Sequence, residues 1–132
     1  MMSNSQTGNI TPSQEDYLKI ALELSNNEGI HSSDIANALG ISRASVSRMM
    51  GVLKDAGYVT QQKYGTVTLT ENGRIIAANV KRRYDLLKAF LIIVLDVEAV
   101  TAAGDACRIE HLISSETTDK INQQLERLSG YR

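Results

Sequence analysis

The chain of 132 residues lacks most features of secreted and membrane-bound proteins. It contains a single cysteine, so an internal disulfide is excluded. No positively charged start followed by an apolar stretch opens the chain, which argues against a signal peptide and predicts a reducing, cytoplasmic location. The longest apolar run, Ala89 to Leu95, is far too short to span a bilayer. Low-complexity tracts and internal repeats are absent as well, so we expect a small globular protein with no membrane partner.

Charge is almost balanced over the whole chain but is distributed unevenly. The formal net charge is −1. Residues 1–83 carry nine Lys or Arg against seven Asp or Glu, whereas residues 84–132 carry five against eight. The first part is therefore net positive by two and the second net negative by three. A nucleic-acid binder of this composition depends on a few well-placed cations, which makes the first part the better candidate for contact with DNA.

The first helix has a strong start signal. Residues 1–10 are polar and are predicted to form a mobile tail. Thr11, Pro12 and Gln14 then have the spacing of an N-cap, a first-turn proline and a capping-box partner. Apolar residues at helical spacing follow, and they predict a helix that continues to about Glu28.

A helix-turn-helix followed by a hairpin is predicted next. Ser32 or Ser33 caps a short second helix and Ser42 caps a third, with Gly40 in the turn between them. Two β-rich segments, residues 58–62 and 66–70, flank a turn at residues 63–65. A helix-turn-helix with a hairpin directly after it is a winged helix, a DNA-binding arrangement. The alternative is an ordinary α+β core that does not bind DNA.

The second half of the chain is predicted to be helical. Helical patterns cover residues 71–95, 97–113 and 116–128, with Ser114 or Ser115 capping the last. The segment Ala89 to Leu95 is apolar on every side, which favours burial against a second copy of the chain, although a fully intramolecular core would also bury it. The fold class is thus mainly α with a small β-hairpin. We expect a winged helix-turn-helix domain over residues 11–72 and a helical metal-binding and dimerisation domain over residues 73–132.

Three residues near the end of the helix predicted over residues 97–113 could bind a metal ion. In a helix, Cys107, Glu110 and His111 stand at positions i, i+3 and i+4 and project from one face. A thiolate, a carboxylate and an imidazole on one face can close on a single transition-metal ion. Each also has an ordinary interpretation. A lone cysteine on a helix is often a small buried hydrophobe, and Glu110 and His111 could be surface residues. His31 is interpreted as a solvated loop residue.

These motifs together resemble the diphtheria-toxin-repressor and manganese-transport-regulator family. The most specific segments are residues 15–18 in the first helix, 45–48 in the third and 105–111 around the cysteine, and the resemblance covers about Thr11 to Leu128. It implies a short form without the SH3-like domain of longer members. Family members are homodimeric repressors that bind Fe²⁺ or Mn²⁺ as corepressor and then bind palindromic operators of metal-uptake genes.

The resemblance also implies a ligand set. Asp16 in the first helix would join Cys107, Glu110 and His111. Asp16 is typical of the manganese branch and Cys107 of the iron branch, so Fe²⁺ or Mn²⁺ is expected, with Zn²⁺ or Co²⁺ able to bind in vitro. One ion per subunit is expected, because a second site would need ligands at positions occupied here by Lys19, Tyr84, Lys88 and Ala103.

Exposed residues of the third helix and of the wing tip are the expected DNA contacts. Arginine suits guanine edges or phosphates, serine suits either, and an alanine can touch a thymine methyl group. A winged-helix regulator without metal control is the main alternative, and a protein-interaction module is another. An enzyme using Cys107 and His111 is not expected, because no third group or oxyanion-type loop accompanies them. The predicted contacts are Ser42, Arg43, Ala44, Ser45, Ser47, Arg48, Lys63 and Tyr64.

Overall fold

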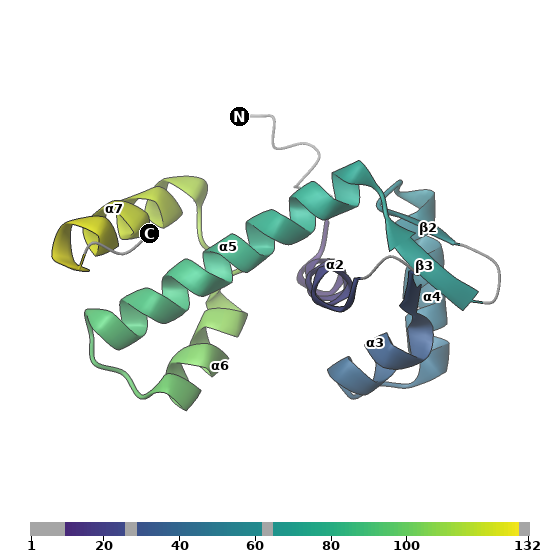
Figure 1. The fold of residues 1–132 in the computed structure, drawn as a ribbon, viewed down its shortest axis with the longest axis horizontal. Coiled ribbons are helices and arrows are strands. Elements are labelled where there is room, and N and C mark those ends of the chain that lie inside the picture. The colour runs from purple at the N-terminus through teal and green to yellow at the C-terminus, as the bar shows by residue number, and fades with distance from the viewer. Residues whose placement is uncertain (1–9, 26–28, 62–64, 130–132) are drawn as a thin grey trace. The chain divides into compact units, whose positions relative to one another are not determined.

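The computed structural model describes residues 10–25, 29–61 and 65–129. They belong to two compact units, Met1–Ala78 and Asn79–Arg132, which we call the winged unit and the helical unit (Figure 1). The predicted mobile tail lies outside the described residues except for Ile10. The mainly helical class with a small antiparallel sheet is confirmed. None of the described helices is long and apolar enough to cross a membrane.

Helix α2, Pro12–Leu24, begins with the predicted capping box. The Gln14 amide donates to Thr11 Oγ1 and the Thr11 amide donates to Gln14 Oε1, both at 3.1 Å. The helix ends earlier than the predicted Glu28, because Ser25 adopts an extended conformation and its amide turns back to the Leu22 carbonyl at 3.2 Å. Residues 26–28 lie outside the described part of the chain.

Helices α3, Ser32–Leu39, and α4, Arg43–Asp55, form the helix-turn-helix. Gly40 ends α3 with φ of 68°, a left-handed conformation that glycine adopts without a steric penalty. Ser42 caps α4 as predicted, accepting from the Ser45 amide at 3.1 Å. The predicted serine cap of α3 is wrong. His31 is the N-cap, without a side-chain hydrogen bond, because the chain enters α3 directly from a strand.

The sheet has one strand more than the sequence indicated. Strands β2, Val59–Gln61, and β3, Thr66–Leu69, form the predicted hairpin, and β1, Ile30–His31, pairs with the other edge of β3. All pairs are antiparallel, with Ile30 opposite Val67 and Val59 opposite Leu69. His31 is exposed, as predicted, but it lies in this strand and not in a loop. Residues 62–64 at the hairpin turn are not described.

A single hydrophobic cluster fills the winged unit. It draws on all three helices, on the sheet and on the first two turns of α5, Glu71–Ile93. Helices α2, α3 and α4 lie together beside the sheet (Figure 1). The buried members of the cluster are Tyr17, Leu18, Ala21, Ile30, Ile35, Ala36, Val46, Met50, Leu53, Val59, Val67, Leu69 and Ala77.

The junction between the hairpin and α5 is closely packed. The Thr70 amide donates to the Tyr58 carbonyl at 3.0 Å, and the Thr70 hydroxyl donates to the Gly57 carbonyl at 2.7 Å. The same hydroxyl accepts from the Gly73 amide at 3.1 Å. A Cβ atom at residue 73 would stand 2.0 Å from the Tyr58 carbonyl oxygen. Glycine is therefore required here, because any side chain would overlap the backbone of the hairpin.

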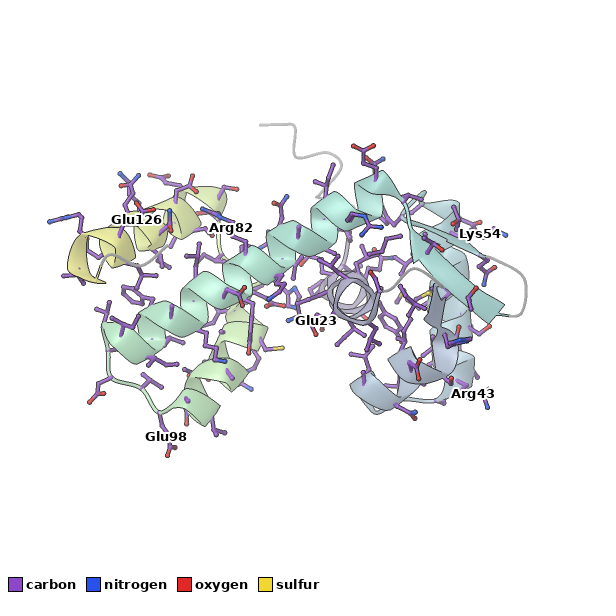
Figure 2. The ribbon with its side chains drawn as sticks, viewed as in Figure 1. Glu23, Arg43, Lys54, Arg82, Glu98 and Glu126 are labelled. Carbon is purple, nitrogen blue, oxygen red and sulfur yellow. The ribbon has the colours of Figure 1, made fainter. Side chains whose placement is uncertain are left out.

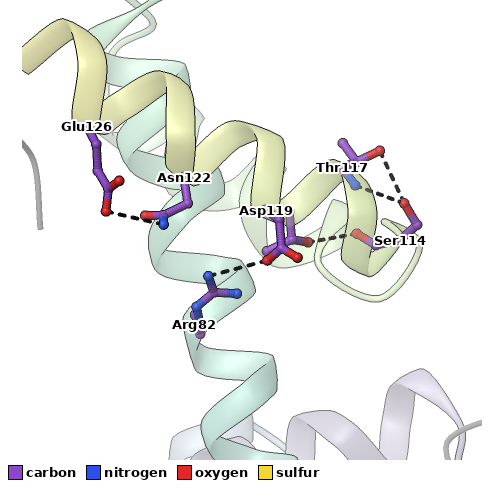
Figure 3. Close-up of polar contacts among 7 residues, drawn as sticks. Arg82, Ser114, Thr117, Asp119, Asn122 and Glu126 are labelled. Carbon is purple, nitrogen blue, oxygen red and sulfur yellow. Dashed lines mark hydrogen bonds and ion pairs between the residues drawn. The ribbon is translucent and has the colours of Figure 1, made fainter.

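The helical unit contains the rest of α5 together with α6, Ala99–Ile109, and α7, Ser115–Ser129. Helix α5 ends at Ile93, close to the predicted Leu95, and the following turn places Asp96 at φ of 59°. Helix α6 is shorter than the predicted residues 97–113. The choice between two serine caps for α7 falls on Ser114, whose hydroxyl accepts from the Thr117 amide at 3.1 Å (Figure 3).

The helical unit has a small core and exposes several large apolar side chains. Helices α6 and α7 flank the C-terminal part of α5 (Figure 1), and Arg82 of α5 pairs with Asp119 of α7 at 3.6 Å (Figure 3). Residues of the apolar segment 89–95 are half-buried or exposed, so the single chain does not bury this segment in an intramolecular core. Up to residue 129, where the description ends, the exposed large apolar residues of the unit are Ile93, Leu95, Val100, Ile109, Leu112 and Leu128.

Candidate metal centre and nucleic-acid interface

Cys107, Glu110 and His111 lie together at the C-terminal end of α6. Glu110 is fully buried, with 0% of its surface exposed. Its Oε2 lies 3.3 Å from His111 Nε2, and the ligand atoms of Cys107 and Glu110 lie within 4.8 Å of one another. The structure thus brings the ligand atoms of Cys107 and Glu110 together and places His111 against Glu110, but the His111 nitrogens are not in the group of ligand atoms that lie within 4.8 Å of one another.

The spacings of Glu110 to Cys107 and of Glu110 to His111 are each short enough for two ligands of a divalent transition metal. Zinc-type bonds of about 2.0–2.3 Å place two ligands of one ion at most roughly 4.6 Å apart, close to the spacings seen here. The burial of Glu110 points the same way, because a carboxylate removed from water is costly unless a positive charge compensates it. Thiolate, carboxylate and imidazole are the donor types that such ions take in proteins.

The sequence predicted that Cys107, Glu110 and His111 lie on one helix, but in the structure they do not all belong to it. Helix α6 ends at Ile109 and Glu110 is its C-cap, still with helical φ and ψ and with its amide donating to the Ala106 carbonyl at 2.9 Å. The Leu112 amide then bonds to the Ile109 carbonyl at 2.8 Å, which tightens the chain into a 3₁₀-type turn. Cys107 is thus helical, while His111 belongs to the turn. We call residues 110–112 the ligand turn.

Polar side chains of α5 and α6 outside the proposed ligand set interact with neighbouring side chains of the helical unit. The Lys88 ammonium lies 5.9 Å from the centre of the Tyr84 ring, a cation–π distance. The carboxylates of Asp85 and Asp105 pair with Lys81 at 3.1 Å and with Arg108 at 2.6 Å. The number of ions per subunit stays a prediction.

The predicted fourth ligand, Asp16, belongs to the winged unit. It lies in the second turn of α2, and its side chain is half-buried. Its neighbour Lys19, which occupies a position where the manganese branch would have a carboxylate, is buried, with 8% exposure. The role of Asp16 stays a prediction.

The predicted DNA contacts on α4 form an exposed polar surface. Val46, Met50 and Leu53 turn into the core, and this leaves the opposite face of α4 to solvent. Arg43 stands at the start of the helix and projects away from the ribbon (Figure 2). Lys63 and Tyr64, predicted at the wing tip, lie outside the described residues. Of the contacts predicted on α4 and its cap, Ser45 is half-buried and the others, Ser42, Arg43, Ala44, Ser47 and Arg48, are exposed.

Three of these side chains are already linked to one another. The Ser42 hydroxyl donates to Ser45 Oγ at 3.0 Å, and an Arg48 guanidinium nitrogen donates to the same Ser45 oxygen at 3.4 Å. Burial raises the pKa of the Tyr17 phenol, and the positive charge of Arg48 partly offsets that rise. The Arg48 charge therefore acts on α2 as well as on the exposed face of α4.

Two family models match almost the whole chain. The N-terminal DNA-binding domain of iron-dependent repressors matches residues 9–67, and their metal-binding and dimerisation domain matches residues 70–130. A DNA-binding winged helix joined to a metal-binding helical unit defines the class, a metal-dependent transcriptional repressor. The chain belongs to the iron-dependent repressor family, which includes the diphtheria-toxin-repressor and manganese-transport-regulator proteins. These proteins are transcriptional repressors, so the chain is not an enzyme.

Individual relatives agree with the family match. A helix-turn-helix regulator of Methanocaldococcus jannaschii is 32% identical over 120 residues, 89% of this chain and 96% of the relative. The regulator MntR of Lysinibacillus sphaericus is 36% identical over 113 residues, 84% of this chain and 80% of the relative. The solved manganese regulator SloR is similar with a TM-score of 0.77 at 31% identity over 89% of this chain. This chain spans only 55% of the SloR structure.

One residue beside the candidate centre was not predicted. Arg83 of α5 donates from Nε to the Glu110 carbonyl at 2.7 Å. Nothing in the local sequence distinguishes it from the adjacent Arg82, because its partner is a backbone atom 27 residues further along the chain.

Proposed function

We propose that the chain is a homodimeric repressor that binds a palindromic operator when each subunit holds one Fe²⁺ or Mn²⁺ ion. The ligands in this proposal are Asp16, Cys107, Glu110 and His111. The observation that carries it is the buried Glu110 carboxylate, which lies 3.3 Å from His111 Nε2 and within 4.8 Å of the Cys107 sulfur. The winged helix in the same chain gives such a cluster a function, because a bound ion can regulate DNA binding.

The donor set supports Fe²⁺ first, with Mn²⁺ close behind. The Cys107 thiolate and the His111 imidazole favour iron, cobalt and zinc, whereas two carboxylates favour manganese. Intrinsic affinity alone would rank Zn²⁺ above both, so availability and coordination geometry must also select the ion. The solved relative SloR is a manganese regulator by name, which keeps Mn²⁺ in the proposal.

The proposed action is a change in geometry that depends on the ion. An ion held jointly by Asp16 and the helical-unit ligands would hold the winged unit in one orientation to the dimer axis. Two α4 helices could then enter major grooves about 34–36 Å apart, one helical turn of DNA. The gain in DNA affinity equals the preference of the ion for that arrangement, and DNA would tighten metal binding by the same factor. In this proposal the protein acts in the cytoplasm, and the genes that it regulates are metal-uptake genes.

The test is DNA binding with Fe²⁺ under anaerobic conditions, Mn²⁺, Zn²⁺ or a chelator, with metal stoichiometry measured alongside. We expect one ion per subunit, DNA binding with metal and its loss with the chelator. Equal DNA binding in the presence of the chelator would favour a winged-helix regulator without metal control. Failure to bind any DNA with metal present would favour a protein-interaction module.

Variants sharpen the assignment of ligands. His111→Ala should abolish metal-dependent DNA binding, while His31→Ala removes the other histidine, exposed in β1, and should not. Cys107→Glu should shift the preference towards Mn²⁺, because it replaces the soft ligand by a hard one. Two ions per subunit at saturation, or an unchanged Fe²⁺ to Mn²⁺ preference in that variant, would contradict the proposed site.

A further inference from the structure

Arg83 holds the chain at the point where helix α6 gives way to the ligand turn. Its Nε–H donates to the Glu110 carbonyl at 2.7 Å, a short hydrogen bond from a charged donor. The last carbonyls of a helix have no partner within the helix and need one elsewhere. Glu110 is the C-cap of α6, so Arg83 supplies that partner to a residue whose carboxylate is a proposed ligand.

The position of this bond affects more than one ligand. Glu110 lies directly before His111, and its amide is fixed from the other side by the Ala106 carbonyl at 2.9 Å. Holding the Glu110 carbonyl therefore fixes the peptide that joins the two residues. The guanidinium charge also lies at the C-terminal end of α6, where the helix dipole favours a cation. Arg83 thus restrains the main chain and adds favourable charge at the same place.

We propose that Arg83 is a positioning residue of the metal centre, which orders the ligand turn before the ion arrives. The inference rests on the proposed metal site. Arginine has five N–H donors and no acceptor, so it does not ligate the ion itself. Its contribution is pre-organisation, because a turn that is already ordered loses less conformational freedom when the ion binds.

The adjacent Arg82 provides a matched comparison on the same helix. Its guanidinium pairs with Asp119 of α7 at 3.6 Å, with the two side chains 48% and 63% exposed (Figure 3). It therefore contacts α7 and not the ligand turn. Replacing either arginine removes the same charge from α5, but only the Arg83 substitution releases the Glu110 carbonyl.

The experiment compares Arg83→Met, Arg82→Met and the unaltered protein in Co²⁺ titrations, which are followed by the thiolate-to-metal absorption band. Methionine keeps an unbranched apolar side chain but has no N–H donor. We expect Arg83→Met to weaken Co²⁺ binding by roughly 10-fold to 100-fold, the range found for residues that orient metal ligands. The band should return at saturating Co²⁺, because Cys107 still ligates. Arg82→Met should bind within about twofold of the unaltered protein, since an exposed ion pair contributes little.

A second measurement needs no metal. In the metal-free protein, hydrogen exchange at the Leu112 amide should accelerate in Arg83→Met and remain unchanged in Arg82→Met. Arg83→Lys restores the charge but not the Nε donor, so binding about threefold weaker than that of the unaltered protein is expected. If Arg83→Met does not fold, the Co²⁺ affinity and the Leu112 exchange rate of Arg83→Lys test the inference instead.

The inference is overturned if the folded Arg83 variants bind Co²⁺ as tightly as the unaltered protein and exchange Leu112 at the same rate. Equal losses in the Arg82 and Arg83 variants would overturn it too, since they would show a general effect of charge on α5. Failure of the unaltered protein to bind Co²⁺ would instead overturn the proposed metal site, and this inference with it.

Discussion

The two units of the chain treat their apolar residues differently. Among the described residues of the winged unit, thirteen are buried in one cluster, and three large apolar side chains, Ile41, Val52 and Ile75, are exposed. The helical unit is smaller, yet the part of it that the structure describes exposes six large apolar side chains, among them Val100 at 81% and Leu112 at 82%. The winged unit completes its core with its own residues, while the helical unit leaves apolar surface for another surface to cover. Different substitutions should therefore damage the two units.

Gly73→Ala tests whether the winged unit is as tightly closed as this comparison implies. The new methyl group would stand 2.0 Å from the Tyr58 carbonyl oxygen, which is backbone and cannot rotate away. We expect a loss of roughly 3 kcal/mol in the free energy of unfolding, at the upper end for overpacking. Chemical denaturation measures it. Gly51→Ala is the matched control, since no atom lies within 4 Å of its added Cβ, and an alanine in helix α4 should stabilise by about 0.5–1 kcal/mol. Equal effects of both variants would show that the hairpin junction is looser than described.

Leu95→Asp tests whether the helical unit uses its exposed apolar surface for dimerisation. Leu95 is 56% exposed at the end of the apolar segment 89–95, and a charge in a dimer interface would be desolvated. The dimer dissociation constant should rise roughly 100-fold, or about 2.7 kcal/mol. Sedimentation of the metal-free protein measures the change. Val52→Asp, which alters an exposed apolar residue of the winged unit, should leave the dimer intact. A stable monomer of the unaltered protein at micromolar concentration would remove the basis of the comparison.

Arg48→Ala tests the polar surface that the winged unit presents on α4. The loss of a guanine contact should weaken operator binding by about 1–3 kcal/mol at one base position, with dimerisation and metal affinity unchanged. Fluorescence anisotropy with operators substituted at single base pairs measures both the loss and its position. Lys54→Ala, near the other end of α4 (Figure 2), should have a smaller effect. Undiminished affinity at every sequence tested would exclude Arg48 as a contact.

Asp96→Gly is expected to have the smallest effect and to stabilise the helical unit. Asp96 adopts φ of 59° between α5 and α6, a conformation that is costly for a residue with a side chain. Because glycine also loses more freedom on folding, the net gain should be only about 0.5 kcal/mol. Urea denaturation of the metal-free dimer can resolve it. Glu98→Gly, at φ of −60°, has no such strain to relieve and should not stabilise.

The candidate site was predictable in residue type but not in backbone form. Cys107, Glu110 and His111 were predicted as ligands because thiolate, carboxylate and imidazole groups all bind transition-metal ions. The place where α6 ends could not be predicted, since no glycine or proline follows Ile109. The Glu110 carbonyl is taken by Arg83, 27 residues away in the chain, and no local pattern reveals that bond. The ligand turn is thus held in part by a hydrogen bond from α5 to the end of α6.

By itself, the sequence determined the helix starts at Thr11 and Ser42, the turn at Gly40 and the hairpin, and it limited the start of α7 to Ser114 or Ser115. Each depends on a hydrogen bond or a backbone preference within a few residues, so local chemistry is sufficient. Only the tertiary structure decided that Ile30 and His31 pair with β3, that Gly73 must lack a side chain and that Arg83 holds the ligand turn. These features join residues 15 or more positions apart, whose contacts depend on how the helices and strands pack together.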